Sequence, residues 1–124
     1  MGLQYELVNL DKKERISFYR VNTGTKLREL AGTEVAGNIV TWYLLQNIGD
    51  RISFVDDSSE EFTLFGNVYK YDTFHTYPDI TEKIIQELIE AEILQDNGIL
   101  WIDKSDDLYF RNLKNIWFTG SSKK

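Results

Sequence analysis

A chain of 124 residues with 42% hydrophobic residues, no cysteine and a net charge of −6 has the size and composition of one small globular domain. This composition excludes a disordered chain, and the lack of cysteine excludes disulfides, thiol catalysis and thiolate zinc sites. The longest apolar run, residues 39–45, is far shorter than the roughly 20 residues that span a bilayer. Because the start of the chain also lacks a secretion signal, the sequence predicts a cytoplasmic protein that does not enter a membrane.

Charge is distributed unevenly along the chain. Residues 34–107 hold 16 acidic and four basic side chains, a net charge of −12, whereas residues 1–33 carry +2 and residues 108–124 carry +4. A segment this negative repels a phosphate backbone and attracts a basic partner. Excess Asp and Glu also favour solubility by themselves, so both interpretations of the acidic segment stay open.

Hydrophobic periodicity predicts the secondary structure in chain order. The sequence predicts strands over 4–9 and 15–21, helices over 25–31 and 33–46, strands over 51–55, 62–65 and 68–71, a loop over 72–77, a helix over 78–94, and a last hairpin of strands over 99–102 and 108–110. Ile16 and Phe18 should point inward from the first hairpin, which should have one buried face. The second helix, apolar on most sides and containing Trp42, should be central and buried.

Short local signals predict how two of these elements begin or turn. The Gly66-Asn67 pair tolerates positive φ and is expected to form the tight turn of the second hairpin. Asp79 and Glu82 have the spacing of a reciprocal cap, in which each side chain accepts a backbone amide at the start of a helix. This cap would fix the start of the helix over 78–94.

The order of elements predicts the fold class. Strands, two helices, strands, one helix and a hairpin follow one another, which favours an α+β fold over a regular βαβ alternation. The expected architecture is a mainly antiparallel sheet with about three helices. No domain boundary stands out, so residues 1–118 are predicted to form a single domain, followed by a flexible tail over 119–124.

His75 is the single histidine and hence the only candidate for an imidazole base. A hydrolase would place it beside a hydroxyl nucleophile, for which the candidates are Ser17, Ser53, Ser58 and Ser59. None of these serines lies in a nucleophile-elbow pattern, so no catalytic residue is predicted. An enzyme that uses dispersed carboxylates, with or without His75, stays open as an alternative, and a pocket lined by two or more acids would favour it.

The acidic run over 56–61 has oxygen ligands for a hard cation but not the pattern of a known site. A helix–loop–helix calcium site needs glycine at the sixth position, where this run has Glu61. Gly24, Gly32 and Gly37 fit neither the nucleotide P-loop nor the dinucleotide fingerprint, and they are expected to stop helices or allow close packing. The sequence therefore predicts a solvated acidic loop, no cofactor and no metal.

Residues 81–110, a helix followed by a hairpin, resemble the last helix and wing of winged-helix DNA-binding domains. Phosphate contacts need Lys or Arg, whereas residues 79–92 have a net charge of −4 and the hairpin turn holds three more acids. A winged-helix regulator is therefore kept as an alternative, and nucleic-acid binding is not predicted.

A resemblance to a known family rests on five stretches, residues 5–9, 28–32, 39–45, 49–55 and 98–101. In these stretches the chain resembles a family of small uncharacterised bacterial proteins. The family resemblance implies no activity and transfers no catalytic residue. In size, acidity and cysteine-free composition the chain is also similar to immunity proteins that neutralise basic nuclease toxins.

The function predicted from sequence is a non-enzymatic acidic module that binds a basic protein, with an immunity role as its specific form. Exposed aromatic residues rimmed by acids are typical of binding hot spots. The residues predicted to contact the partner are Asp56, Asp57, Glu60, Glu61, Tyr69, Tyr71, Asp72, His75 and Tyr77. Self-association of the chain stays open.

Overall fold

The structure is a computed structural model that describes residues 3–117. It contains four helices and antiparallel sheets, so the predicted α+β class is confirmed. The strands are β1 (Tyr5–Asn9), β2 (Glu14–Ser17), β3 (Ile52–Asp56), β4 (Glu61–Leu64), β5 (Asn67–Lys70), β6 (Leu94–Asp103) and β7 (Leu108–Asn115). The helices are α1 (Leu27–Gly32), α2 (Glu34–Gln46), α3 (Tyr71–Phe74) and α4 (Thr81–Glu90). The tail predicted over 119–124 lies outside the described residues.

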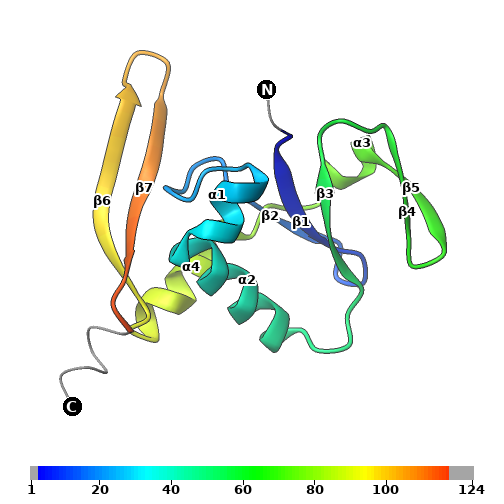
Figure 1. Ribbon diagram of the computed structural model, residues 1–124, viewed down its shortest axis with the longest axis horizontal. Coiled ribbons are helices and arrows are strands. Elements are labelled where there is room, and N and C mark those ends of the chain that lie inside the picture. Colours follow the sequence, from blue (N-terminus) through cyan, green and yellow to red (C-terminus); the bar gives the residue numbers. More distant parts are fainter. Residues whose placement is uncertain (1–2, 118–124) are drawn as a thin grey trace.

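A three-stranded antiparallel sheet with the order β2-β1-β3 lies in the middle of the molecule (Figure 1). β1 is therefore the central strand, and its Leu7 pairs with Ile16 of β2 and with Phe54 of β3. The hairpin β4–β5 lies with α3 at one end of the long axis, and the longer hairpin β6–β7 lies at the other end (Figure 1). Helices α1, α2 and α4 lie between the sheet and the long hairpin.

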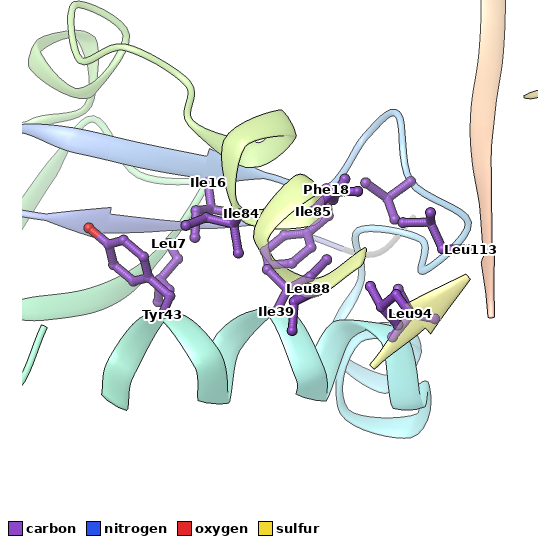
Figure 2. Close-up of a cluster of buried hydrophobic side chains, with 12 residues drawn as sticks. Leu7, Ile16, Phe18, Ile39, Tyr43, Ile84, Ile85, Leu88, Leu94 and Leu113 are labelled. Atoms are coloured by element: carbon purple, nitrogen blue, oxygen red, sulfur yellow. The ribbon is translucent and has the colours of Figure 1, made fainter. Parts of the chain in front are cut away.

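The main core lies between one face of the sheet and the helices α2 and α4 (Figure 2). Its buried side chains are Leu7, Ile16, Phe18, Val21, Val35, Ile39, Tyr43, Ile84, Ile85, Leu88, Leu94 and Leu113. Val35, Ile39 and Tyr43 follow one another at four-residue spacing, so α2 presents them on one face. Leu94 and Leu113 belong to β6 and β7, so the same core holds the base of the long hairpin.

A smaller core covers the opposite face of the sheet. Its buried side chains are Val8, Leu10, Val55, Phe74 and Tyr77, with side chains of β4 and β5 packed against them. Ile16 and Phe18 point into the main core as predicted, but the prediction of one buried face for the first hairpin was wrong. The region predicted as a loop over 72–77 contains the helical turn α3, which supplies Phe74 as cover for the second face.

Helix α2 is not a central helix, contrary to the prediction. Leu44 is 42% exposed and Leu45 is 66% exposed, because the buried residues of the helix, among them Val35, Ile39 and Tyr43, lie on its other side. Trp42 is half-buried, and its Nε1 donates a hydrogen bond to Glu87 Oε1 of α4 at 2.8 Å. With 13 residues, α2 is the longest helix, and no helix among residues 3–117 is long and apolar enough to cross a membrane.

Helix α4 is shorter than predicted and starts without the expected reciprocal cap. It ends at Glu90, and Leu94 belongs to β6, where it still reaches the main core. The N-cap residue is Ile80, which has no capping side chain, and Glu82 forms an ion pair with Arg111 of β7. The distant arginine offers Glu82 a charged partner, and this ion pair takes the place of the local cap.

The tight turn between β4 and β5 lies one residue earlier than predicted. Its central residues are Phe65 and Gly66, with φ of 51° and 83°. Two successive residues with positive φ are the geometry of a type I′ turn, whose twist matches that of the paired strands. The pairing of Leu64 with Asn67 moves the turn to Phe65, a residue that the sequence pattern assigned to a strand.

A buried amide fixes the turn after β1 to the rest of the fold. Asn9 is fully buried; its Nδ2 donates to the Tyr43 hydroxyl and to Asp50 Oδ2, both at 2.9 Å. Its Oδ1 accepts the backbone amides of Asp11 and Lys12, also at 2.9 Å. One side chain therefore connects β1, α2 and the turn before β3 with all its hydrogen-bonding groups satisfied.

We expect Asn9→Ala to lower the free energy of unfolding by about 3 kcal/mol, because it leaves several buried or half-buried groups without their partner. Urea denaturation followed by tryptophan fluorescence measures this change. Asn97→Ala is the control, since Asn97 is exposed on β6 and its side chain makes no hydrogen bond within residues 3–117. Equal stability of the two variants would contradict the role given to Asn9.

Candidate functional site

The acidic connection between β3 and β4 has a defined shape. Asp56 Oδ1 accepts the backbone amide of Ser58 at 2.9 Å and its hydroxyl at 2.5 Å. The Asp57 amide donates to the Gln4 carbonyl, and the Gln4 amide donates back to Asp57 Oδ1, each at 3.1 Å. These bonds hold the start of the acidic connection against the start of β1.

This connection and the start of α3 enclose a hollow of about 560 Å³, called here the acidic hollow. Its lining residues are Asp57, Ser58, Ser59, Glu60, Glu61, Lys70, Tyr71 and Asp72. Four carboxylates thus face one ammonium group. Within residues 3–117, none of the four forms a salt bridge with Lys or Arg.

The nine residues predicted to contact a partner have different places in the structure. Five of them line the acidic hollow: Asp57, Glu60, Glu61, Tyr71 and Asp72. Asp56 lies at its border, and the exposed ring of His75 meets the Tyr71 ring edge-on at 4.7 Å. Tyr69 is half-buried, and Tyr77 is only 7% exposed, because both rings pack against Phe74. Tyr77 therefore supports the site from the core, and its predicted contact with a partner needs correction.

A second hollow of about 310 Å³ adjoins the first and is called here the Glu6 hollow. Its lining residues include the charged Glu6, Arg15, Asp57 and Asp79, the polar Gln4, Ser17 and Thr25, and the aromatic Tyr5, Phe18, Tyr19 and Tyr71. Asp57 and Tyr71 line both hollows. The Glu6 hollow therefore continues the acidic hollow toward strands β1 and β2.

Glu6 is the least satisfied polar group of this region. Its side chain is 13% exposed, and Oε2 accepts a long hydrogen bond of 3.3 Å from Arg15 Nη1. Oε1 is buried and has no hydrogen-bond partner among residues 3–117. Burial raises the pKa of Glu6, and Asp79 adds to the increase, although Arg15 and His75 lower it.

Asp79 is held firmly beside Glu6. Its Oδ2 accepts the Ser17 hydroxyl at 2.5 Å, and its Oδ1 accepts the backbone amide of Thr81 at 3.0 Å. The single proton of the Thr81 hydroxyl has two alternative acceptors, the Ser17 carbonyl at 2.8 Å and Asp79 Oδ1. This network ties β2 to the start of α4 and keeps the Asp79 carboxylate in a fixed position on the hollow.

Glu6, Arg15 and Asp79 are not among the residues predicted from sequence to contact a partner. Alternation along the first hairpin predicted that the neighbours of Ile16 and Phe18 face solvent. The spacing of Asp79 and Glu82 predicted that Asp79 caps a helix. No local pattern indicated that α3 packs over the second face of the sheet. A glutamate between Tyr5 and Leu7 in a strand is a weak signal, because the same pattern is common on solvated sheets.

Basic residues from the two ends of the chain neutralise part of the acidic segment. Within residues 3–117, four of its 16 acids form ion pairs with them, namely Asp50, Glu82, Asp96 and Asp107. Three of these pairs lie at or near the β6–β7 hairpin. Among the acids without a salt bridge to Lys or Arg within residues 3–117, Asp56, Asp57, Glu60, Glu61 and Asp72 lie on or beside the connection between β3 and β4, at the opposite end of the molecule (Figure 1). Others, such as Glu34, Glu90 and Asp106, lie elsewhere on the chain.

The arrangement meets one condition of the enzyme alternative, since Glu6, Asp57 and Asp79 share one hollow. Ser17 donates its hydroxyl to Asp79, and His75 does not line this hollow. Within residues 3–117, no group of three His, Cys, Asp or Glu side chains is placed to hold a metal ion. Catalysis by dispersed carboxylates stays a hypothesis, and ion pairing and hydrogen bonding are what this geometry offers directly.

The chain matches no protein-family model, no curated protein and no solved structure. The functional inference therefore depends on the two hollows themselves.

The raised pKa of Glu6 predicts an unusual pH dependence of stability. Between its ordinary value of 4.5 and the raised folded value, the folded chain retains a proton that the unfolded chain has released. The contribution of Glu6 to the free energy of unfolding therefore falls as the pH rises through this window. Because glutamine carries no charge, Glu6→Gln should be more stable than the unmodified protein at neutral pH, and this advantage should vanish below 4.5.

Urea denaturation at a series of pH values measures both parts of this prediction. Other carboxyls affect stability at lower pH, because their pKa is lowered in the fold from an ordinary value of 3.8. These are Asp11, Asp50, Asp96 and Asp103. Glu92→Gln is the matched control, because Glu92 is exposed. A loss of stability in Glu6→Gln at neutral pH would show that the charged form of Glu6 supports the fold.

Proposed function

We propose that the protein is a binding module that binds a basic protein at the acidic hollow. The observation that carries the proposal is the set of four carboxylates on this hollow, which has a single lysine and no salt bridge to these acids within residues 3–117. Repulsion among unpaired carboxylates is relieved when a cationic surface approaches. A binding role accounts for this arrangement without a catalytic step.

The position of the hollow also favours a protein as the partner. Asp57 is hydrogen-bonded to Gln4 just before β1, and the Tyr71 amide of α3 donates to the Glu60 carbonyl, so part of the hollow is ordered before binding. Exposed His75 and partly exposed Tyr71 offer ring surfaces beside the carboxylates. Aromatic side chains bordered by charge are typical of sites where one protein recognises another.

An immunity role is the specific form of this proposal, in which the partner is a basic toxin in the same cytoplasm. The resemblance in size, acidity and cysteine-free composition supports this form. The winged-helix alternative gains less support. Hairpin β6–β7 does follow α4, but its turn carries Asp103, Asp106 and Asp107, which oppose a phosphate backbone.

The proposal predicts that neutralising the acidic hollow abolishes capture of a basic partner. In the hollow variant, Glu60→Gln, Glu61→Gln and Asp72→Asn remove three exposed carboxylates. Capture from an extract of the cells that make the protein, read by mass spectrometry, should recover a basic protein with the unmodified chain and not with this variant. Added salt should release the captured protein, because surface charge attraction is screened.

A charge-matched control carries Glu90→Gln, Glu92→Gln and Asp106→Asn, which are exposed and lie outside both hollows. It has the same net charge as the hollow variant and should keep the partner. A lysine decapeptide provides a second measurement with a defined probe. Its affinity should fall about tenfold in the hollow variant and stay within about twofold in the control. An equal loss of affinity in both variants would show that binding depends only on net charge, and it would overturn the proposal.

A further inference from the structure

The Glu6 hollow lies next to the acidic hollow and is chemically different from it. The two share Asp57 and Tyr71, so one partner surface can contact both hollows. The acidic hollow is lined by exposed carboxylates on a connection. In the Glu6 hollow, the central carboxylate comes from the middle strand of the sheet and is almost buried.

We propose that the Glu6 hollow receives one lysine or arginine side chain of the basic partner, with Glu6 as its main acceptor. This inference rests on the proposed function and adds the group that the site recognises. Glu6, Asp57 and Asp79 supply three carboxylates, against which Arg15 is the one cation that lines the hollow. This excess of negative charge favours the binding of a further cation over that of an anion.

The unpaired oxygen of Glu6 is the feature that calls for a ligand. A buried carboxylate normally accepts several hydrogen bonds, because burial without partners is costly. Oε1 has none among residues 3–117, and the terminal torsion of glutamate turns easily. A small rotation would present this oxygen to an ammonium or guanidinium group that enters the hollow.

Arg15 does not complete the coordination of Glu6. Its Nε donates to the Tyr77 carbonyl at 3.0 Å, which fixes the guanidinium toward the smaller core. From this position Nη1 reaches only Oε2, at 3.3 Å. Arg15 therefore reduces the cost of burying Glu6 and leaves the second oxygen available.

The walls of the hollow also suit a cationic side chain. Tyr5, Tyr19 and Tyr71 line it, and aromatic faces attract ammonium and guanidinium groups as well as the methylene stem that carries them. Tyr19 is 53% exposed, and it already contacts one cation, since Arg20 Nε donates to its hydroxyl at 2.9 Å and the guanidinium carbon lies 5.1 Å from the ring centre. The volume of about 310 Å³ lies at the small end of ligand sites, which fits one side chain better than a large cofactor.

Three blocked tripeptides test the inference on the full chain: glycyl-arginyl-glycine, glycyl-lysyl-glycine and the neutral glycyl-norleucyl-glycine. Nuclear magnetic resonance follows the side-chain carboxyl carbon of Glu6 during each titration. The two cationic peptides should shift this signal, and norleucine should not. In Glu6→Gln their affinity should fall about tenfold or more, since a hydrogen bond to a charged group is lost.

Tyr19→Ala is a second variant, chosen because the exposed ring lies outside both cores. It should weaken the cationic peptides about two- to fivefold without changing the free energy of unfolding by much. A role of Glu6 in folding alone would predict lower stability and unchanged affinity in Glu6→Gln. The proposal predicts higher stability at neutral pH together with weaker binding.

The results separate this inference from the proposed function. If the cationic peptides leave the Glu6 signal unchanged, or bind Glu6→Gln and the unmodified chain equally, the Glu6 hollow is not the cation site. The acidic hollow can still pass its own test with Glu60, Glu61 and Asp72. If the hollow variant also keeps the partner and the lysine decapeptide, the proposed function fails as well.

Discussion

The alternation of side chains along β1 is the constraint on which the fold and the site both depend. Successive residues of a strand point to opposite faces, and β1 is the central strand of a sheet that is covered on both faces. Leu7 therefore enters the main core, and Val8 enters the smaller one. Glu6 shares a face with Val8, so the same geometry that builds the smaller core carries a carboxylate into its edge. A shift of register by one residue would turn Leu7 and Val8 to the opposite faces and point Glu6 toward the main core.

Asn9 and Glu6 lie in the same strand and show two uses of a buried polar group. Asn9 satisfies its hydrogen bonds with Tyr43, Asp50 and the next turn, which makes it part of the framework. Glu6 keeps one oxygen without a partner within residues 3–117, and its pKa is raised by burial. We expect such a group to lower stability at neutral pH, and an interaction with a partner would account for its place in the site.

The sequence predicted much of the acidic hollow and little of the Glu6 hollow. Asp57, Glu60, Glu61, Tyr71 and Asp72 are close in sequence, so a short connection and one helical turn suffice to bring them together. The Glu6 hollow instead combines β1, β2 and the residues before α4, and its ion pair and hydroxyl contacts span up to 62 positions. Local patterns carry no information about such distances, and they assigned Asp79 to a reciprocal cap with Glu82, whereas Asp79 Oδ1 accepts the Thr81 amide and Glu82 pairs with Arg111.

By itself the sequence determined the α+β class, the first hairpin, the span of α2 and the excess of acid in the middle of the chain. These features follow from periodicity and composition, which act over a few residues. Only the tertiary structure decided which charges stay uncompensated, because Lys12, Arg20 and Arg111 come from the ends to pair with acids of the middle. It also decided that both faces of β1 are buried, since that depends on where the turn α3 packs. Burial and charge pairing are properties of neighbours in space, and the chain brings those neighbours from distant positions.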